Sequence, residues 1–383
     1  MTRVLLVPDL PIERWPSMDR YASRLVAHLP CPPELDIAVA GKIARLTEDV
    51  PARESRTSGA LESSLVPSGI SELDRYVERY ITYPFRVRRQ AADVLHVLDH
   101  SYAHMVPARS GRPAVVTVHD LLPLITLRQR SAGLRARGRK FLLQRVLDGL
   151  RRARAWIVGT EWMRGELAAW LKREDGLHVI PFGVDDAFFE QPAESRAQTR
   201  ERWGIPDDRF VLLHVGSVTN RKNIPGVLAT AYGLRARGLP VWLLQVGDRF
   251  TDAQSVEIRS RDLGSVITQV GATTEPDLRA AYRAADVLLF PSHYEGFGLP
   301  LLEAMAPGLP IVTSGAAALA EVAGDAAAVI EGRDPDRNVA AVAGVAEDAA
   351  WARDLAGRGR ERARRFTWSE TARRTAEVYR TVA

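Results

Sequence analysis

Short apolar runs alternate with segments of helical periodicity along almost the whole chain. Because strands that alternate with helices form parallel sheets covered by helices, this pattern predicts an α/β protein. Two sets of strands, each long enough for a doubly wound sheet, predict two Rossmann-like domains in tandem. The predicted strands of the first set are Val4–Val7, Ile37–Ala40, Val94–Val97, Ala114–Val118, Ala155–Val158 and His178–Ile180. Those of the second set are Phe210–Val215, Val241–Gln245, Val266–Val270, Val287–Phe290, Ile311–Thr313 and Ala327–Ile330.

Polar stretches indicate where these domains separate. The predicted boundary is Asp186–Ser195, and Ala52–Gly69, rich in Ser, Arg, Glu and Pro, is predicted to be a loop of the first domain. The last segment, Phe366–Val382, predicts a helix that begins near Thr367 or Ser369. Its apolar side would consist of Ala372, Ala376, Val378 and Tyr379.

The composition narrows the class of protein to which the chain can belong. A chain of 383 residues with 46% hydrophobic and 26% charged residues is an ordinary globular protein, long enough for two cores. The single cysteine, Cys31, excludes an internal disulfide and fits a reducing compartment. The first residues read as a strand rather than a secretion signal, and no apolar run approaches the roughly 20 residues of a membrane span. We therefore expect a cytoplasmic protein.

The most informative segment for chemistry is His293–Ala306, which follows a predicted buried strand. Gly296 and Gly298 allow the backbone to approach a ligand closely. Pro300 suits the first position of a helix, where its missing N–H would have no partner. The N–H groups at such a helix start favour anionic oxygens, so the segment predicts a phosphate-binding turn.

Two glutamates, Glu295 and Glu303, flank this turn. Because 47 of the 383 residues are carboxylates, their spacing alone carries little weight. Glu303 is expected in the first turn of the helix. A carboxylate there accepts the two hydroxyl hydrogens of a vicinal diol, or it caps the helix.

Two cations, Arg221 and Lys222, follow the predicted strand Phe210–Val215 and Gly216. This places them at the carboxyl edge of a parallel sheet, where such folds bind ligands. Fixed positive charge there would favour an anionic ligand. The alternative is a solvated, charged helix start.

His119 follows another predicted strand, Ala114–Val118, and precedes Asp120. It is either a ligand-binding residue at the sheet edge or a structural histidine bonded to Asp120. The segment Asp334-Pro335-Asp336 resembles a metal-binding Asp-x-Asp, but its place before a helix favours capping. The pattern contains no ligand cluster of the metal-binding type.

Taken together, these segments resemble the retaining glycosyltransferases of family 4, which have the GT-B fold. The resemblance is strongest from about residue 205 to 325 and rests on the His293–Ala306 string, His119-Asp120, Pro181–Asp185, Gly216–Asn223 and Gln245–Gly247. It implies two Rossmann-like doubly wound domains that face a cleft. Residues 1–190 would bind the acceptor and residues 191–365 the nucleotide sugar, and residues 366–383 would form a helix that crosses back to the N-terminal domain.

The resemblance also implies roles for individual residues. His119, Glu295, Arg221 and Lys222 would be catalytic, with the two cations on the diphosphate, Glu295 near the donor sugar and His119 on a sugar hydroxyl. Glu303 would bind the ribose of the nucleotide. The remaining predicted donor-binding residues are Gly216, Phe297, Gly298 and Leu299, and packing is an equal alternative for Phe297.

The implied reaction is a metal-independent, retaining transfer of a hexose without any cofactor. GDP-mannose is the leading donor and a UDP-hexose the second, and the acceptor would be a glycan or a lipid-linked glycan. A nucleotide-sugar 2-epimerase and a non-catalytic nucleotide-binding module of the same fold are the alternatives. The loop Pro8–Pro16 lacks the Gly-Gly pair that many members of the family carry, and Asp19 stands where glycine is usual.

A basic segment, Arg128–Arg154, holds ten cations and one acid, Asp148. Apolar residues recur in it at helical intervals, so it would form an amphipathic contact with anionic lipid at the inner face of the membrane. A solvated helix is the favoured alternative. No recognition motif supports nucleic acid as a partner.

Overall fold

The computed structural model describes residues 1–13, 16–30, 35–40, 72–108, 111–122, 134–191, 193–271, 273–332 and 334–383. Cys31 and the predicted loop Ala52–Gly69 lie outside these residues, as do residues 128–133 of the basic segment. The contacts divide the chain into two compact units. Unit 1 comprises Met1–Pro181 and Trp368–Ala383, and unit 2 comprises Phe182–Thr367.

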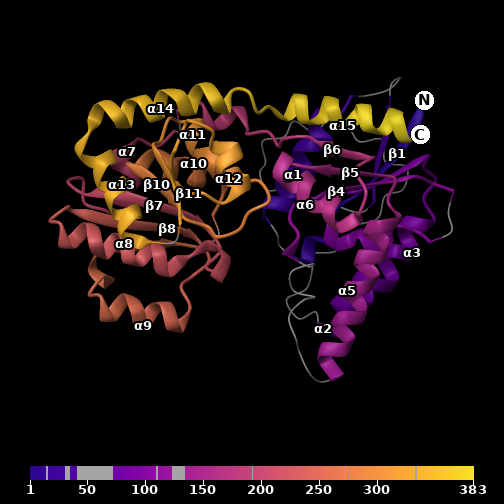
Figure 1. The fold of residues 1–383 in the computed structure, drawn as a ribbon, viewed down its shortest axis with the longest axis horizontal. Helices are drawn as coiled ribbons and strands as arrows, with labels where there is room; N and C mark the ends of the chain where they lie inside the picture. Colours follow the sequence, from indigo (N-terminus) through magenta and orange to yellow (C-terminus); the bar gives the residue numbers. More distant parts are fainter. Residues whose placement is uncertain are drawn as a thin grey trace. The chain divides into compact units, whose positions relative to one another are not determined.

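Both units are α/β, as the alternating pattern predicts (Figure 1). The strands of unit 1 are β1 (Thr2–Val7), β2 (Leu35–Val39), β3 (Val94–Val97), β4 (Ala114–Val118), β5 (Ala155–Val158) and β6 (Leu177–Val179). Those of unit 2 are β7 (Phe210–Gly216), β8 (Val241–Gly247), β9 (Ile267–Val270), β10 (Val287–Phe290), β11 (Ile311–Ser314) and β12 (Ala328–Ile330). Each lies at a predicted strand, and its ends differ from the predicted ones by at most two residues.

The two sheets are parallel but differ in strand order. In the described residues, the sheet of unit 2 has the order β12-β11-β10-β7-β8-β9, which is the Rossmann order. The sheet of unit 1 has the order β2-β1-β3-β4-β5-β6, which is the flavodoxin-like order. In both sheets, successive strands are added first on one side of the first strand and then on its other side. The chain therefore runs in opposite directions from two neighbouring strands, and the switch point lies between them at the carboxyl edge.

Helices cover the sheets. In unit 1 they are α1 (Pro16–His28), α2 (Glu72–Val77), the π-helix η2 (Glu78–Thr82), α3 (Tyr83–Arg88), α5 (Leu134–Arg152), α6 (Glu161–Leu171) and α15 (Trp368–Val382), with the 3-10 helices η1 (Pro11–Glu13) and η3 (His100–Met105). In unit 2 the 3-10 helices are η4 (Asp186–Phe188), η5 (Asn220–Lys222) and η6 (Gly264–Val266). Its α-helices are α7 (Arg196–Arg202), α8 (Ile224–Ala236), α9 (Asp252–Ser260), α10 (Glu275–Ala284), α11 (Leu299–Met305), α12 (Ala317–Ala323), α13 (Pro335–Glu347) and α14 (Ala349–Ala363). Within unit 2, α8 and α10 lie on opposite sides of the sheet (Figure 1).

Polar side chains begin several of these helices. Ser195 and Thr251 form capping boxes with Gln198 and Gln254 at the starts of α7 and α9. Asp334 accepts a hydrogen bond from the Asp336 N–H at the start of α13, so this Asp-x-Asp segment is a helix cap, as predicted. Because side chains satisfy these terminal N–H groups, the helices can start at the positions seen.

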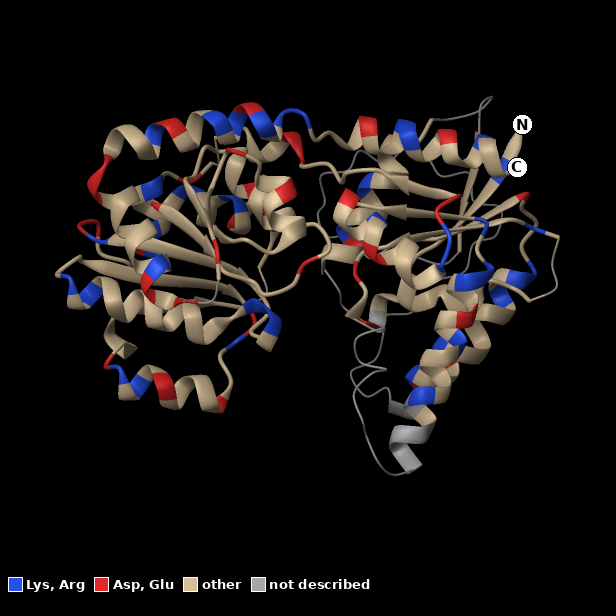
Figure 2. Cartoon of the chain, viewed as in Figure 1, with Lys and Arg blue, Asp and Glu red and all other residues tan. Residues whose placement is uncertain are grey.

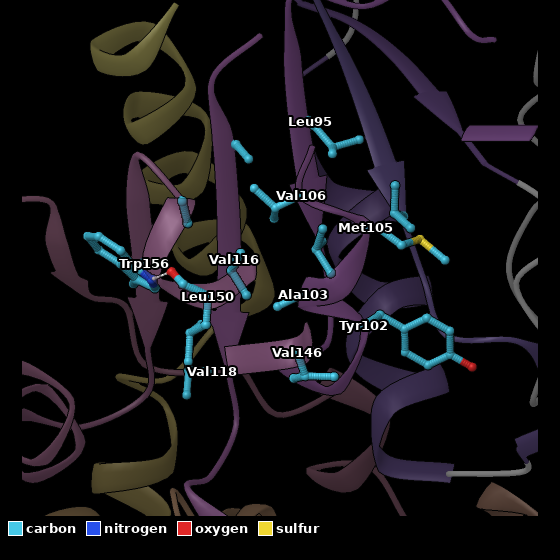
Figure 3. Packing of buried hydrophobic residues seen from close by; sticks show 14 of the residues in the cluster. Leu95, Tyr102, Ala103, Met105, Val106, Val116, Val118, Val146, Leu150 and Trp156 are labelled. Carbon is cyan, nitrogen blue, oxygen red and sulfur yellow. Dashed lines mark hydrogen bonds between the residues drawn. The ribbon is translucent and has the colours of Figure 1, made fainter. Parts of the chain in front are cut away.

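The core of unit 1 packs between its sheet and the helices η3 and α5 (Figure 3). Trp156 of β5 is fully buried, and its indole N–H donates to the Leu150 carbonyl oxygen over 2.9 Å. A side chain at Gly149 of α5 would place a Cβ atom 1.8 Å from the Ala103 carbonyl oxygen of η3. Glycine therefore allows these two helices to approach at backbone distance.

The division between the units does not lie in the polar stretch Asp186–Ser195 that the sequence suggested. It falls after Pro181 and again after Thr367, rather than at 190 and 365. Residues 182–190 belong to unit 2 because Val184 donates from its N–H to the Phe366 carbonyl oxygen and Arg279 donates to the Ala187 carbonyl oxygen. Helix α15 belongs to unit 1, where it packs against α1.

Within the described residues, no helix combines the length and the apolar character that crossing a bilayer requires.

Candidate functional site

The switch point of unit 2 lies between β7 and β10. These strands are hydrogen-bonded neighbours, with Leu212 opposite Val287, although three α-helices, two 3-10 helices and two strands separate them along the chain. The residues that follow them, Gly216–Asn223 after β7 and Pro291–Gly298 after β10, therefore meet at one edge of the sheet. The N–H of His293 donates to the Arg221 carbonyl oxygen over 2.7 Å, which ties the two segments together.

Glu295 lies between the two predicted cations at this edge. Its Oε1 atom is 2.7 Å from Lys222 Nζ, and its Oε2 atom accepts a hydrogen bond from Arg221 Nη1 over 2.8 Å. The side chains of Lys222 and Glu295 are 7% and 10% exposed, whereas that of Arg221 is 30% exposed. Arg221 therefore keeps the larger accessible surface for a ligand, and Lys222 supplies buried positive charge behind it.

The electrostatics of this cluster favour the charged carboxylate. Burial by itself would raise the pKa of Glu295, but the charges of Lys222 and Arg221 outweigh it and lower that pKa. Burial lowers the pKa of Lys222, and Glu295 opposes this shift. Lys222 Nζ also lies 4.4 Å from the centre of the Phe290 ring, where the ring face favours a cation.

Gly216 leaves the space that Lys222 occupies. A Cβ atom at Gly216 would lie 3.2 Å from Lys222 Cε, and the backbone has a left-handed φ of 135° that favours glycine. Beneath this contact, Gln245 Nε2 donates to the Gly216 carbonyl oxygen over 3.1 Å. Gly216 therefore serves the packing of the cation as well as the turn.

Sequence reasoning missed His214, which supports the same strand end. Its Nδ1 atom lies 2.7 Å from Gln245 Oε1, and the residue is fully buried in β7. Burial, and next the charge of Lys222, lower the pKa of His214 to about 4, so the ring is neutral at physiological pH. The available signal was a polar residue at an apolar strand position two residues before Gly216.

The turn that precedes α11 has the predicted glycine geometry, but its helix begins one residue earlier than expected. Gly298 has a φ of 103° and is the N-cap, Leu299 is the first helical residue and Pro300 the second. The expectation of a carboxylate in the first helical turn was wrong, because Glu303 is the fifth residue of α11. Capping is therefore not the role of Glu303.

Glu303 instead points into the unit. It is 4% exposed, and its Oε2 atom accepts a hydrogen bond from Tyr282 Oη of α10 over 2.7 Å. Its charge acts to raise the pKa of Lys222, which places both residues in one electrostatic cluster. Tyr282 was not predicted, because nothing in the sequence links the α10 and α11 positions.

The other predicted residues of this segment have structural contacts. Phe297 is 3% exposed, and its ring centre lies 4.8 Å from that of Phe182 and 6.2 Å from that of Phe366. Its side chain is therefore a core residue of unit 2, which leaves only its backbone for a ligand. Asp185 stands at the N-cap position of η4, but its side chain makes no capping hydrogen bond there.

His119 lies in unit 1, at the end of β4. Its Nε2 atom is 2.8 Å from the Leu98 carbonyl oxygen and must donate, because a carbonyl only accepts. Its ring meets Tyr21 edge-on at 4.9 Å, and burial lowers its pKa. This hydrogen bond goes to Leu98 and not to Asp120, and a ligand-binding role for His119 stays a prediction.

The structure thus brings together Gly216, Arg221, Lys222 and Glu295, with Glu303 close enough to act on Lys222. Buried positive charge at a switch point is suited to bind an anionic group such as a diphosphate. Among the described residues, no three His, Cys, Asp or Glu side chains are grouped so that they could hold a metal ion.

Comparisons with known proteins place both units in one enzyme class. Residues 195–365 match the family model "Glycosyl transferases group 1", and residues 43–188 match "Glycosyltransferase Family 4". The chain is 26% identical over 371 residues to the O-antigen chain mannosyltransferase B of Escherichia coli, covering 94% of this chain and 95% of that protein. It is 35% identical over 223 residues to a D-inositol 3-phosphate glycosyltransferase of Kineococcus radiotolerans, where the match covers 53% of this chain and about half (51%) of that relative.

The fold has close counterparts among solved structures. HepE of Anabaena, solved in complex with UDP and glucose, superposes with a TM-score of 0.75 at 16% identity and covers 98% of this chain and 99% of that one. At this identity the similarity concerns the fold alone, and it agrees with the GT-B architecture predicted from the sequence.

Proposed function

The chain belongs to the family 4 glycosyltransferases, and on that premise we propose that it transfers a hexose from a nucleotide diphosphate sugar to a hydroxyl group of a glycan acceptor. One observation carries the proposal: Arg221 and buried Lys222 converge with Glu295 at the switch point of unit 2.

The chemistry of the donor explains why this arrangement suits transfer. When the glycosidic bond breaks, negative charge grows on the β-phosphate and positive charge on the sugar ring. Cations that are already fixed in place stabilise the developing anion without reorganisation during the reaction. The contact of Lys222 with Glu295 fixes its ammonium group, and the exposed part of the Arg221 guanidinium has further N–H donors for phosphate oxygens.

We propose that the reaction retains the configuration of the sugar without a covalent intermediate. A carboxylate nucleophile needs a free oxygen, whereas each oxygen of Glu295 already contacts a cation. Glu295 is better suited to orient Arg221 and Lys222. The departing phosphate would then take the proton of the acceptor hydroxyl, on the same face of the sugar. No metal ion is needed in this scheme, because the two cations supply the positive charge.

GDP-mannose is our leading donor and a UDP-hexose the second. The first choice is supported by the relative that matches over nearly its whole length, which is named as a mannosyltransferase. The second is supported by HepE, whose structure was solved with UDP and glucose. Glu303 and Tyr282 would bind the nucleotide ribose, a part that both donors share.

A thermal-shift panel of GDP, UDP, ADP and TDP, each with and without EDTA, tests the donor site. We expect GDP to give the largest shift and EDTA to change none of the shifts. A shift that EDTA abolishes would contradict the metal-free scheme. Sugar release in the absence of any acceptor would instead favour an epimerase, and nucleotide binding without turnover on any acceptor would favour a non-catalytic module.

We further propose that the basic helix α5 contacts an anionic membrane surface, as a lipid-linked acceptor would require. Lys and Arg residues recur along α5 (Figure 2), and Phe141 on this helix is 64% exposed. Basic residues around an exposed aromatic ring favour the interface of an anionic bilayer.

Sedimentation with vesicles tests this contact. The protein should bind vesicles that contain phosphatidylglycerol at low salt, release them at high salt and ignore phosphatidylcholine vesicles. Phe141→Ser should weaken binding, whereas Val256→Ser, at a 56% exposed position on α9 of unit 2, should not. Equal binding to both kinds of vesicle would refute an electrostatic contact.

A further inference from the structure

The sheet of unit 1 has its own switch point, between β1 and β3. The strands are neighbours in register, with Val7 opposite Val97. Asp9 follows Val7 by two residues and Asp99 follows Val97 by two residues, so the two carboxylates lie at matching positions of the carboxyl edge. In sheets of this order, ligands bind at this edge and at this switch point.

Asp9 is the notable residue of this edge because its carboxylate is buried and only partly satisfied by hydrogen bonds. It is 3% exposed, and its Oδ2 atom is buried without a hydrogen-bond partner among the described residues. Burial and the nearby carboxylates Asp99 and Asp19 raise its pKa to about 7, and a hydrogen bond to its own backbone acts in the opposite direction. Glu13 adds further negative charge.

The neighbours of Asp9, in contrast, have partners within the unit. Asp99 accepts a hydrogen bond from the Ser101 N–H over 2.7 Å at the start of η3. Arg79 donates to Glu13 over 3.0 Å. Asp9 is therefore surrounded by carboxylates, and the nearby cation Arg79 is already paired with Glu13.

An unpaired buried carboxylate is costly to keep. A polar atom that is buried without a partner loses the hydrogen bonds it would make with water, and like charges add to this penalty. A group that lowers stability and leaves a buried oxygen atom without a partner is typical of a binding site. A hydroxyl or N–H donor of a ligand would satisfy the free Oδ2 atom.

We propose that this edge binds the acceptor through Asp9, and that it selects a neutral, hydroxyl-bearing sugar or polyol over a phosphorylated one. The inference rests on the proposed function, since a transferase needs a second substrate. A hydroxyl group can donate to Oδ2, whereas a phosphate would bring acceptor oxygens and negative charge to Asp9, on which the charges of Asp99 and Asp19 already act. This chain would then differ in its acceptor from the relatives named for inositol 3-phosphate.

Acceptor kinetics with matched probes test the proposal. GDP-mannose and UDP-glucose serve as donors, and methyl α-mannoside, inositol and inositol 3-phosphate serve as acceptors, with release of the nucleoside diphosphate as readout. We expect the wild type to use at least one neutral acceptor and to prefer inositol over its phosphate. Asp9→Asn should raise the KM for the neutral acceptor at least about tenfold, which corresponds to the loss of one hydrogen bond to a charged group.

Controls separate this inference from the proposed function. Asp9→Asn should bind GDP or UDP with wild-type affinity, because Asp9 lies in unit 1 and the candidate donor site in unit 2. Asp175→Asn, at an exposed position before β6, should leave the KM unchanged.

Each outcome is informative. Intact nucleotide binding with an unchanged acceptor KM in Asp9→Asn would overturn this inference alone, as would a wild-type preference for inositol 3-phosphate. Failure of the wild type to bind any nucleoside diphosphate would overturn the proposed function, and this inference with it.

Discussion

At the scale of single residues, the candidate site of unit 2 is an ion cluster in which one carboxylate serves two cations. Glu295 accepts contacts from both Arg221 and Lys222, and Gly216 leaves room for the lysine side chain. A buried ammonium group without such a partner would lose its proton or displace its neighbours. The cluster therefore keeps positive charge at the sheet edge even though Lys222 is almost fully buried.

Lys222→Ala should nearly abolish transfer. The loss of a charge-assisted contact to the leaving group should lower turnover at least about tenfold, since each such contact contributes about 1.5–3 kcal/mol. Steady-state kinetics with the best donor of the thermal-shift panel provide the measurement. Arg259→Ala removes an exposed cation of α9 and is the matched control. A full rate in Lys222→Ala would exclude this lysine from the site.

Asp9→Asn should stabilise the protein at alkaline pH. The pKa of Asp9 in the folded protein, about 7, lies above its ordinary value of 3.8, so the folded state holds a proton that the unfolded state releases between these values. The wild type therefore loses stability as the pH rises from 4 to 7, and the loss is complete above 7. The amide variant has no such charge to bury.

Thermal unfolding across pH provides the measurement for Asp9→Asn. Its melting temperature should exceed that of the wild type at pH 8, by about 2–4 °C for each kcal/mol, and the difference should vanish near pH 4. The exposed Asp175→Asn variant should show no gain at high pH. Parallel profiles for wild type and Asp9→Asn would contradict the raised pKa.

At the scale of elements, the turn between β10 and α11 depends on backbone conformations that most residues avoid. Gly298 combines a left-handed φ of 103° with close packing, since a Cβ atom there would lie 2.5 Å from Leu319 Cδ2 of α12. This turn places Glu295 on one side and Glu303 on the other. A change in its path should therefore move both carboxylates.

Gly298→Ala should destabilise unit 2 by roughly 1–3 kcal/mol through backbone strain and overlap with Leu319. It should also weaken nucleotide binding. The double variant with Leu319→Ala should relieve the overlap but keep the strain. Gly357→Ala is the matched control, because a Cβ atom at this position of α14 meets nothing within 4 Å, and it should stabilise by about 0.5–1 kcal/mol. Urea unfolding of the wild type, Gly298→Ala, the double variant and Gly357→Ala would show whether their stabilities follow these expectations.

At the scale of the whole molecule, unit 1 is completed by the end of the chain. Tyr379 of α15 places its Oη atom 2.6 Å from His96 Nδ1 of β3, and His96 Nε2 lies 2.9 Å from Thr117 Oγ1 of β4. Tyr21 of α1 joins the same chain of contacts through Thr117 over 3.0 Å. The last helix is therefore part of the folding unit that the first strand begins.

Tyr379→Phe should destabilise unit 1 selectively, by roughly 1–3 kcal/mol, because it leaves buried His96 without one hydrogen-bond partner. Hydrogen exchange measured by mass spectrometry should show faster exchange in β3 and β4, with unit 2 unchanged. Tyr76→Phe, at a 42% exposed position, is the control for loss of a hydroxyl. Faster exchange in both units alike would mean that the helix does not act on unit 1 alone.

The sequence by itself determined the elements and the family. Strand positions, helix caps and the glycine-rich turn are local properties, because they depend on residue type and on neighbours within a few positions. The order of the segments then sufficed to recognise the GT-B fold and to select Gly216, Arg221, Lys222, Glu295 and Glu303 as one group.

Only the tertiary structure decided what these residues contact. Strand order sets which loops meet, so the placement of Glu295 between two cations, the bond from Tyr282 to Glu303 and the matching of Asp9 with Asp99 depend on pairings between distant segments. The same holds for Phe297, whose side chain proved to be core, and for the unit boundary at Pro181. Contacts of this kind arise from packing across the sheet, so they cannot be predicted from residue type and local spacing.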